Sequence, residues 1–200
     1  MTAQPPALPS PCYLLEEAKL RRNLELIGRV SKETGCHFIL ALKSFAMWSV
    51  FPLVTRYLEG CAASSLNEAT LARTRFGGHL HVYAPAYSED EFPQLLALSD
   101  RISFNSLSQW RRFSGRALAA GVSAGLRVNP EINEVGTALY NPCGEQSRLG
   151  IRSQELHDAL PDGVAGLHVH ALCESGADST ERLIEAVERR LAICWDRCAG

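Results

Sequence analysis

The stretch Phe38-Ile39-Leu40-Ala41-Leu42-Lys43-Ser44-Phe45 is an apolar run that ends in a lysine. The chain has only three lysines, and the other two, Lys19 and Lys32, lie in a polar segment with helical spacing. An ammonium group at the end of a buried strand is costly to desolvate, so its pKa tends to fall and the free amine becomes a nucleophile. Lys43 is therefore a candidate for Schiff-base chemistry, although such a lysine can also simply mark where a strand reaches solvent.

Working outward from this run, strand-like and helix-like segments alternate along the chain. A helix is expected over 16–33 before the first strand, and helical spacing returns at 46–58, 67–75, 89–98 and 107–120. The last strand is followed by an amphipathic helix with one apolar face formed by Leu183, Ile184, Val187, Leu191 and Cys194. The expected strands are Phe38–Leu42, Cys61–Ser64, His79–Ala84, Arg101–Phe104, Ala124–Val128 and Gly166–Ala171. Strand followed by helix, repeated at roughly thirty residues, favours a parallel sheet with crossover helices.

The residues that follow the strands distinguish an open sheet from a barrel. The segment from Leu42 to Met47 contains no glycine, which weakens a dinucleotide-binding interpretation of the first strand. Polar or turn residues end every strand, at Lys43, Ser64-Ser65, Pro85, Asn105, Asn129 and His170. Because barrel enzymes carry their chemistry at that edge, we predict a TIM-type (β/α)8 barrel, apparently truncated after about six of its units.

Composition limits the classes of function. The chain has 200 residues, 46% of them hydrophobic, and a net charge of −2, so it offers no basic field for nucleic acid or anionic lipid. No window contains the roughly 18 apolar residues that a membrane helix needs. Residues 1–15 are expected to form a loose N-terminal arm and residues 16–200 a partial barrel.

Seven cysteines occur at irregular spacing without a CxxC pair. This pattern argues against a disulfide framework and favours a reducing cytoplasm, in which most of these cysteines would be small buried hydrophobic residues.

One segment interrupts the repeat. Residues 129–150 contain two prolines with few aliphatic residues and begin at the end of the fifth strand, so they form either a functional loop or a flexible insertion.

Paired histidines allow two interpretations. His168 and His170 alternate on one strand face, as do His79 and His81. Two imidazoles at this spacing could share a zinc ion, but further ligands at the strand ends are hard to find, so we predict no metal site. Alternatively, the flat ring of His170 could stack on a flat cofactor, which together with Lys43 points to pyridoxal phosphate.

Several motifs, in order along the chain, resemble the pyridoxal-phosphate decarboxylases that have an alanine-racemase-like barrel. The lysine motif of that family is matched by Leu40-Ala41-Leu42-Lys43, and its Ser-x-x-Glu pattern by Ser65-Leu66-Asn67-Glu68. Three further matches are Leu126-Arg127-Val128-Asn129-Pro130, Ser147-Arg148-Leu149-Gly150 and Gly166-Leu167-His168-Val169-His170. Where most of the family has Gly-Ser, this chain continues Ala171-Leu172-Cys173-Glu174, which resembles the branch acting on carboxynorspermidine and carboxyspermidine.

The resemblance implies a role for each matched residue. Lys43 would hold pyridoxal 5'-phosphate as an imine, His170 would stack on its ring and Arg127 would lie beneath it. Ser65 and Glu68 would shape the site, and Glu174 could face the cationic tail of a polyamine-precursor amino acid. The role of Cys173, which replaces a phosphate-site residue, stays open.

The resemblance also implies an assembly. The family forms homodimers, its N-terminal arm contributes a strand to a β-domain, and the C-terminal β-domain, with further catalytic groups, would lie beyond Gly200. The alternatives are diaminopimelate decarboxylation, racemisation on the same scaffold, and a non-catalytic truncated chain that binds the cofactor weakly or only associates with partners. Separately, the isolated chain is expected to aggregate or to need a partner, because an incomplete barrel leaves strand edges unpaired.

Overall fold

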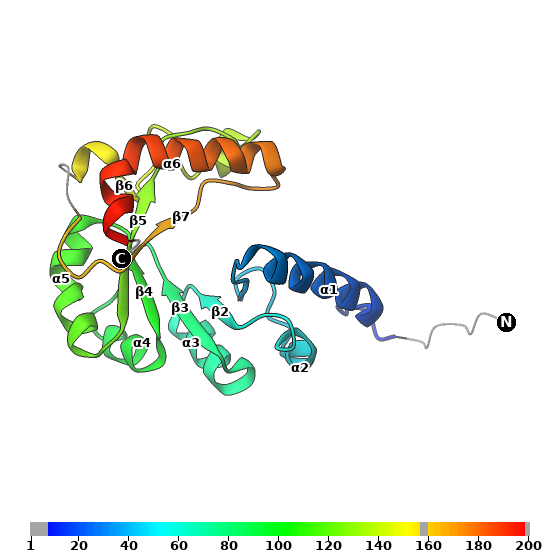
Figure 1. Ribbon diagram of the computed structural model, residues 1–200. Coiled ribbons are helices and arrows are strands. Elements are labelled where there is room, and N and C mark those ends of the chain that lie inside the picture. The colour runs from blue at the N-terminus through cyan, green and yellow to red at the C-terminus, as the bar shows by residue number, and fades with distance from the viewer. Residues whose placement is uncertain (1–7, 157–159, 199–200) are drawn as a thin grey trace.

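The computed structural model describes residues 8–156 and 160–198, with only the backbone of residues 191–198. Within these ranges strands alternate with helices (Figure 1). The strands are β1 (Ile39–Ala41), β2 (Gly60–Ala63), β3 (His79–Tyr83), β4 (Arg101–Phe104), β5 (Ser123–Asn129), β6 (Ile151–Arg152) and β7 (Gly166–Val169). The helical elements are α1 (Glu17–Thr34), η1 (Trp48–Val50), α2 (Phe51–Val54), α3 (Leu66–Leu71), η2 (Ala72–Phe76), α4 (Phe92–Leu98), α5 (Leu107–Ala119), η3 (Ala138–Tyr140), η4 (Ser153–Glu155) and α6 (Ala177–Cys198).

The strands form one parallel sheet in which β1 to β5 follow one another in chain order. Val128 of β5 pairs with Ile151 of β6 and also with Val169 of β7, so β6 and β7 lie along opposite edges of β5. Strands that succeed one another without reversal are typical of a barrel, whereas a doubly wound sheet reverses its order at a switch point. The predicted α/β barrel class is confirmed.

Side chains from non-neighbouring strands meet on one face of this sheet. The ring centroid of His168, on β7, lies 4.7 Å from that of Tyr83 and 5.9 Å from that of His81, both on β3. Because β4 and β5 lie between, a flat sheet would separate these strands by roughly 14 Å. The sheet is therefore strongly curved, with α3, α4 and α5 outside the curve (Figure 1).

The two faces of the curved sheet differ in polarity. On the convex face, apolar strand residues such as Leu80, Val82, Ile102, Phe104 and Leu126 are almost fully buried. They pack against an aromatic cluster that includes Phe92 and Phe113, whose ring centroids are 4.4 Å apart. The concave face instead carries His81, Tyr83, Ser103, Arg127 and His168. This polar interior differs from the bulky aliphatic filling of an ordinary TIM barrel and leaves the concave side suited to a polar ligand.

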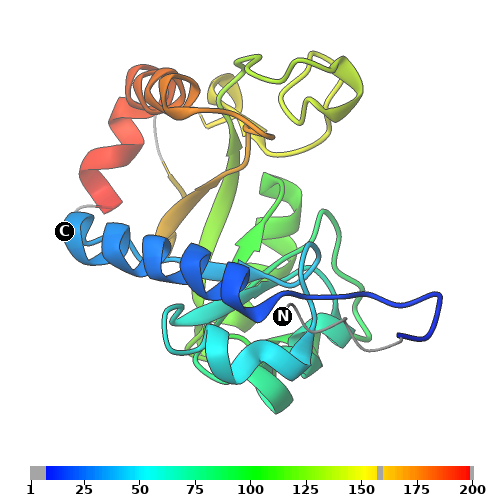
Figure 2. The same cartoon turned by 90° about the vertical axis from the view of Figure 1, so that its right-hand side faces the viewer.

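The segment between β5 and β6 is folded rather than a simple insertion. It contains η3, and it lies beside α6 at one end of the molecule (Figure 2). Two ion pairs join it to that helix, Glu134 to Arg182 at 2.6 Å and Glu131 to Arg190 at 3.1 Å.

Some expected elements are shorter or absent. The helix expected over 46–58 is reduced to η1 and the short α2, because Pro52 occupies the first turn of α2 and a proline ring is excluded from a helix interior. The two-residue β6 was not predicted. In α6, Val187 is buried as expected, but Ile184 is 51% exposed, and the side chains of Leu191 and Cys194 lie outside the described residues.

The cysteines that the structure describes contradict the expectation that most cysteines are buried. Cys12, Cys36, Cys61, Cys143 and Cys173 are not in disulfides, but only Cys61 and Cys143 are buried. The prediction that most cysteines are buried is therefore wrong for those described. Among the helices that the structure describes, none combines the length and apolarity needed to cross a membrane.

Candidate active site

Lys43 lies in the turn that follows β1. Its side chain is exposed, and Phe38 and Ile39 in the same run are 36% and 40% exposed, so the expected desolvation of this lysine is not found. Burial is the largest cause that lowers the pKa values of His168 and His170, and the positive charge of Lys43 adds to it in both cases.

Arg127 is the buried cation of the concave face, with only 4% of the residue exposed. Nη1 donates a hydrogen bond to the Tyr83 hydroxyl, and Nη2 donates to the carbonyl oxygen of His170 at 3.3 Å. Cζ of Arg127 lies 4.9 Å from the centroid of the Tyr83 ring. Within the described part of the chain, no carboxylate forms an ion pair with Arg127. Its charge is thus available to an anionic ligand.

His170 directly follows β7 and is partly buried. Its ring and that of His168 are inclined by 30°, with centroids 6.3 Å apart. Burial, followed by the charges of Lys43 and Arg127, lowers the pKa of His170, so the ring is held neutral and suits flat stacking. Two of the predicted site residues, Arg127 and His170, are thus in direct contact, and Lys43 lies in the turn after β1.

Ser65 and Glu68 are engaged at the start of α3. The Ser65 hydroxyl accepts from the backbone N–H of Glu68 at 3.2 Å, and the Glu68 carboxylate accepts from the N–H of Ser64 at 2.7 Å. This is N-terminal capping of a helix, in which side chains satisfy backbone donors. Among the described residues, neither side chain hydrogen-bonds to Lys43, Arg127 or His170, so any effect on the site is indirect.

Glu174 lies beyond β7 in an unusual backbone conformation. Its φ is +51°, in the left-handed region that non-glycine residues seldom adopt, and its side chain is exposed. Its carboxylate forms no ion pair with another described residue. Cys173 beside it is also exposed, and its carbonyl oxygen accepts from the Ser175 hydroxyl at 3.1 Å.

The histidines of β3 and β7 do not form a metal site in the region that the structure describes, where no three His, Cys, Asp or Glu side chains are placed to share an ion. His81 is hydrogen-bonded to the Ser103 hydroxyl at 2.8 Å. Burial is the main cause that lowers the pKa of His168, to about 3, with smaller contributions from neighbouring charges.

Two residues of the site had no assigned role in the sequence. Tyr83 contacts Arg127, and Asn105, which follows β4, accepts a hydrogen bond from the Tyr83 hydroxyl at 2.9 Å. The sequence did contain a signal for both. Tyr83 shares the alternating face of His79 and His81, and Asn105 is one of the polar residues that end a strand.

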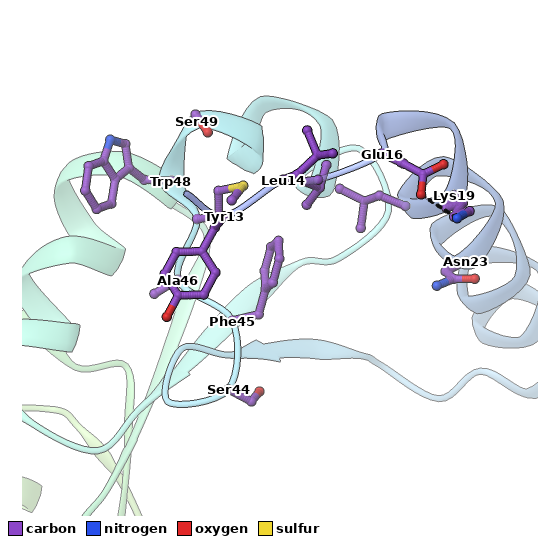
Figure 3. Close-up of a pocket in the computed structure, with 13 residues that line it drawn as sticks. Tyr13, Leu14, Glu16, Lys19, Asn23, Ser44, Phe45, Ala46, Trp48 and Ser49 are labelled. Carbon is purple, nitrogen blue, oxygen red and sulfur yellow. Dashed lines mark hydrogen bonds and ion pairs between the residues drawn. The ribbon is translucent and has the colours of Figure 1, made fainter. Parts of the chain in front are cut away.

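A large hollow lies elsewhere, between the N-terminal segment and the turn after β1 (Figure 3). Its volume is about 1070 Å³, and its lining includes Tyr13, Leu14, Phe45 and Trp48. Ser44 lines this hollow and is the neighbour of Lys43, but Arg127 and His170 do not line it. The candidate site is therefore defined by the side chains of the concave face and not by this hollow.

The concave face has polar atoms that lack a partner. Nδ1 of His168 and Nδ2 of Asn129 are buried without a hydrogen bond to any described residue. Buried polar atoms are almost always paired, so such exceptions call for an explanation. Together with the cations Lys43 and Arg127, they fit a flat, anionic group that carries hydrogen-bonding atoms.

Comparison with known proteins supports this interpretation of the fold. No family model matches the chain. The chain is 44% identical over 183 residues to carboxyaminopropylagmatine decarboxylase of Synechocystis. It is 41% identical over 181 residues to carboxynorspermidine/carboxyspermidine decarboxylase of Campylobacter jejuni. This chain is a homologue of these decarboxylases. The matches cover 92% and 90% of the chain but 47% of each relative, so the chain spans about half their length.

Solved structures agree with this relationship. A crystal structure of carboxynorspermidine decarboxylase from Campylobacter jejuni, complexed with norspermidine, superposes with a TM-score of 0.83 at 38% identity. It covers 92% of this chain and 47% of that one. Diaminopimelate decarboxylase from Helicobacter pylori, complexed with L-lysine, gives a TM-score of 0.72 at 17% identity over 90% of this chain and 49% of that one. Alanine racemase from Corynebacterium glutamicum gives 0.62 at 16% identity over 90% and 50% of the two chains. The last two comparisons establish a common fold.

Proposed function

We propose that this protein acts in the pyridoxal-phosphate-dependent decarboxylation of carboxynorspermidine or carboxyspermidine, which yields norspermidine or spermidine in polyamine biosynthesis. The observation that carries the proposal is the contact between Arg127, whose buried charge has no carboxylate partner among the described residues, and His170, with Lys43 in the turn after β1. The identity with carboxynorspermidine/carboxyspermidine decarboxylase over nine-tenths of the chain supports it.

Each residue has a proposed task. Lys43 would hold the cofactor covalently through its ε-amine, and the substrate amine would replace the lysine amine on the cofactor. His170, kept neutral, would stack on the cofactor ring, and Arg127 would supply an uncompensated positive charge to the cofactor. When bound, pyridoxal phosphate accepts the electron pair that remains on Cα after carbon dioxide leaves an amino acid.

The other predicted residues act at a distance from the cofactor. Ser65 and Glu68 fix the turn between β2 and α3 and shape the site through it. Glu174 offers an exposed carboxylate to the cationic tail of the substrate. The unpaired buried atoms of His168 and Asn129 provide hydrogen-bonding positions on the same face.

A direct test uses the small number of lysines. The protein is incubated with pyridoxal phosphate, reduced with borohydride and mapped by mass spectrometry. We expect the label on Lys43, and not on Lys19 or Lys32, together with visible absorbance that is lost in Lys43→Ala but kept in Lys32→Ala. Labelling at all three lysines alike would contradict a specific site.

Substrate choice has a second candidate. The 44% identity with carboxyaminopropylagmatine decarboxylase favours a substrate whose tail ends in a guanidine group in place of an amine. Carbon dioxide release from carboxynorspermidine, carboxyspermidine, carboxyaminopropylagmatine and diaminopimelate would distinguish these. Consumption of diaminopimelate alone would contradict the polyamine assignment, and consumption of none by a protein that binds the cofactor would indicate a non-catalytic role for this chain.

We also propose a homodimer. The side chains of Tyr13, Leu14 and Trp48 are 97%, 70% and 58% exposed around the large hollow, and exposed apolar surface of this kind favours association. Sedimentation velocity at increasing concentration should show a dimer that Trp48→Glu weakens, whereas a monomer at all concentrations would contradict the proposal.

A further inference from the structure

The hydroxyl of Tyr83 is shared between two neighbours. It accepts a hydrogen bond from Nη1 of Arg127 and donates one to Oδ1 of Asn105 at 2.9 Å. A phenol has a single hydrogen to donate, so the bond to Asn105 leaves its lone pairs directed to the guanidinium. The face of the ring lies against the same guanidinium. Tyr83 therefore holds Arg127 through both its oxygen and its ring.

Asn105 extends this contact to the backbone before β6. Its Oδ1 also accepts from the N–H of Gly150 at 3.0 Å, and its Nδ2 donates to the carbonyl oxygen of Arg148 at 3.0 Å. Both ends of the amide are used. The side chain of Asn105 thus fastens residues 148–150 to the end of β4.

The segment 141–150 is also held by its own hydrogen bonds. The Ser147 hydroxyl donates to the carbonyl oxygen of Pro142 at 2.6 Å and accepts from the N–H of Leu149 at 3.1 Å. Cys143 of this segment is buried; burial raises the pKa of its thiol, and the charge of Arg127 opposes that shift. The segment is therefore linked to Arg127 through Asn105 and Tyr83.

We propose that Tyr83 is a positioning residue that fixes the guanidinium of Arg127 for anion binding and couples its orientation to the seating of residues 141–150. The inference rests on the proposed function, in which Arg127 stabilises pyridoxal phosphate. Removing the hydroxyl leaves one guanidinium donor without an acceptor and removes one of the hydrogen bonds to Asn105. A buried cation that loses an acceptor is costly, so the effect should reach the ligand.

The first test compares Tyr83→Phe with Tyr87→Phe in titrations with pyridoxal phosphate. Tyr87 is a matched control because it is buried and its hydroxyl donates to the carbonyl oxygen of Ser103 at 2.8 Å, on the convex side. Phenylalanine keeps the ring contacts of Tyr83. We expect Tyr83→Phe to weaken binding roughly tenfold or more, the size of a lost hydrogen bond to a charged group, and Tyr87→Phe to leave binding within about threefold of wild type.

A double-mutant cycle separates positioning from general destabilisation. If Tyr83 acts through Arg127, Tyr83→Phe should weaken binding of pyridoxal phosphate by less than about twofold in an Arg127→Gln background. The reason is that the effects of substitutions at two coupled residues do not add. Equal effects in the two backgrounds would overturn the proposal, as would wild-type binding by Tyr83→Phe.

Amide hydrogen exchange gives a readout that needs no cofactor. Exchange at Gly150 should be faster in Tyr83→Phe than in Tyr87→Phe, and equal rates would overturn the coupling to the segment.

If wild type fails to bind pyridoxal phosphate, the proposed function fails, while this measurement still decides the link from Tyr83 to Gly150. If Tyr83→Phe does not fold, Asn105→Ala is used in its place. This variant should show faster amide exchange at Leu149 and weaker binding of pyridoxal phosphate. If both values equal those of wild type, the proposal is overturned.

Discussion

His168 and Tyr83 meet edge to face with ring centroids 4.7 Å apart, although β7 and β3 are not neighbours in the sheet. This contact places the imidazole of His168 within the concave face, where the charges of Arg127 and Lys43 act on it. Burial and these charges all disfavour the protonated ring. His168 is therefore a neutral group in a positively charged environment, and this has a measurable consequence for stability.

The free energy of unfolding should fall as the pH drops below 6.5. In the unfolded chain His168 titrates near 6.5, whereas its pKa in the folded protein is lowered to about 3, so between these values only the unfolded state binds the proton. The stability is fully present above pH 6.5 and is lost toward pH 3, by about 1 to 2 kcal/mol at pH 5. Denaturant titrations at several pH values measure this slope.

A variant that cannot titrate isolates the contribution of His168. His168→Gln should flatten the slope, while His37→Gln, at an exposed position paired with Glu59, should keep it. His81 and His170 have lowered pKa values of the same origin and should leave a residual slope. An unchanged slope in His168→Gln would mean that His168 is not the group responsible.

Gly150 should tolerate no side chain. Its φ is +81°, and a Cβ there would lie 2.9 Å from the carbonyl carbon of Val128 and 3.0 Å from the backbone nitrogen of Asn129. Because these neighbours are backbone atoms of β5, they cannot move aside cheaply. Gly150→Ala should destabilise the protein by about 2 kcal/mol or more.

Gly115, in the exposed interior of α5, is the matched control. A Cβ there meets nothing within 4 Å, and alanine favours helix over glycine. Gly115→Ala should therefore stabilise the protein by about 0.5 to 1 kcal/mol. Similar losses of stability in both variants would contradict the backbone contact inferred at Gly150.

Local pattern was sufficient for much of the fold. The alternation His79-Leu80-His81-Val82-Tyr83 predicted a half-buried strand, and β4 has the predicted bounds, because in both cases one face packs on apolar helices. Lys43, Arg127 and His170 were predicted as one site from family motifs; Arg127 does contact the backbone of His170, and the shared site stays a prediction. These features follow from the spacing of apolar and polar residues along a single strand and from short sequence motifs.

The remaining features depend on contacts between distant segments. β6 has only two residues and pairs with β5 directly after Gly150, which Asn105 holds by a hydrogen bond, and no local periodicity predicts such a pairing. Exposure of Lys43 could not be predicted, because it depends on what covers β1. The role of Tyr83 became visible only when curvature of the sheet brought β3 to β5 and β7.

Ser65 tests whether a capping residue affects the cofactor site. Ser65→Ala should cost about 1 kcal/mol because α3 loses its N-terminal cap, and Ser106→Ala, which removes the equivalent cap of α5, should cost about the same. If the turn before α3 shapes the site, only Ser65→Ala should also weaken binding of pyridoxal phosphate. Ser65→Asp keeps a capping oxygen and should restore stability; equal binding by the two alanine variants would remove Ser65 from the site.

Glu174 tests recognition of the substrate tail. An exposed carboxylate that pairs with a cationic amine contributes about 0.2 to 1 kcal/mol, so Glu174→Gln should raise KM for carboxynorspermidine roughly two- to fivefold with little change in kcat. Affinity for pyridoxal phosphate should not change, because Lys43, Arg127 and His170 are untouched.

Glu181, exposed on α6, provides the control Glu181→Gln, for which KM should equal that of wild type. Added salt should reduce the difference between wild type and Glu174→Gln, since screening weakens surface charge pairs. A KM that is unchanged in Glu174→Gln at low salt would show that the tail is recognised by other groups.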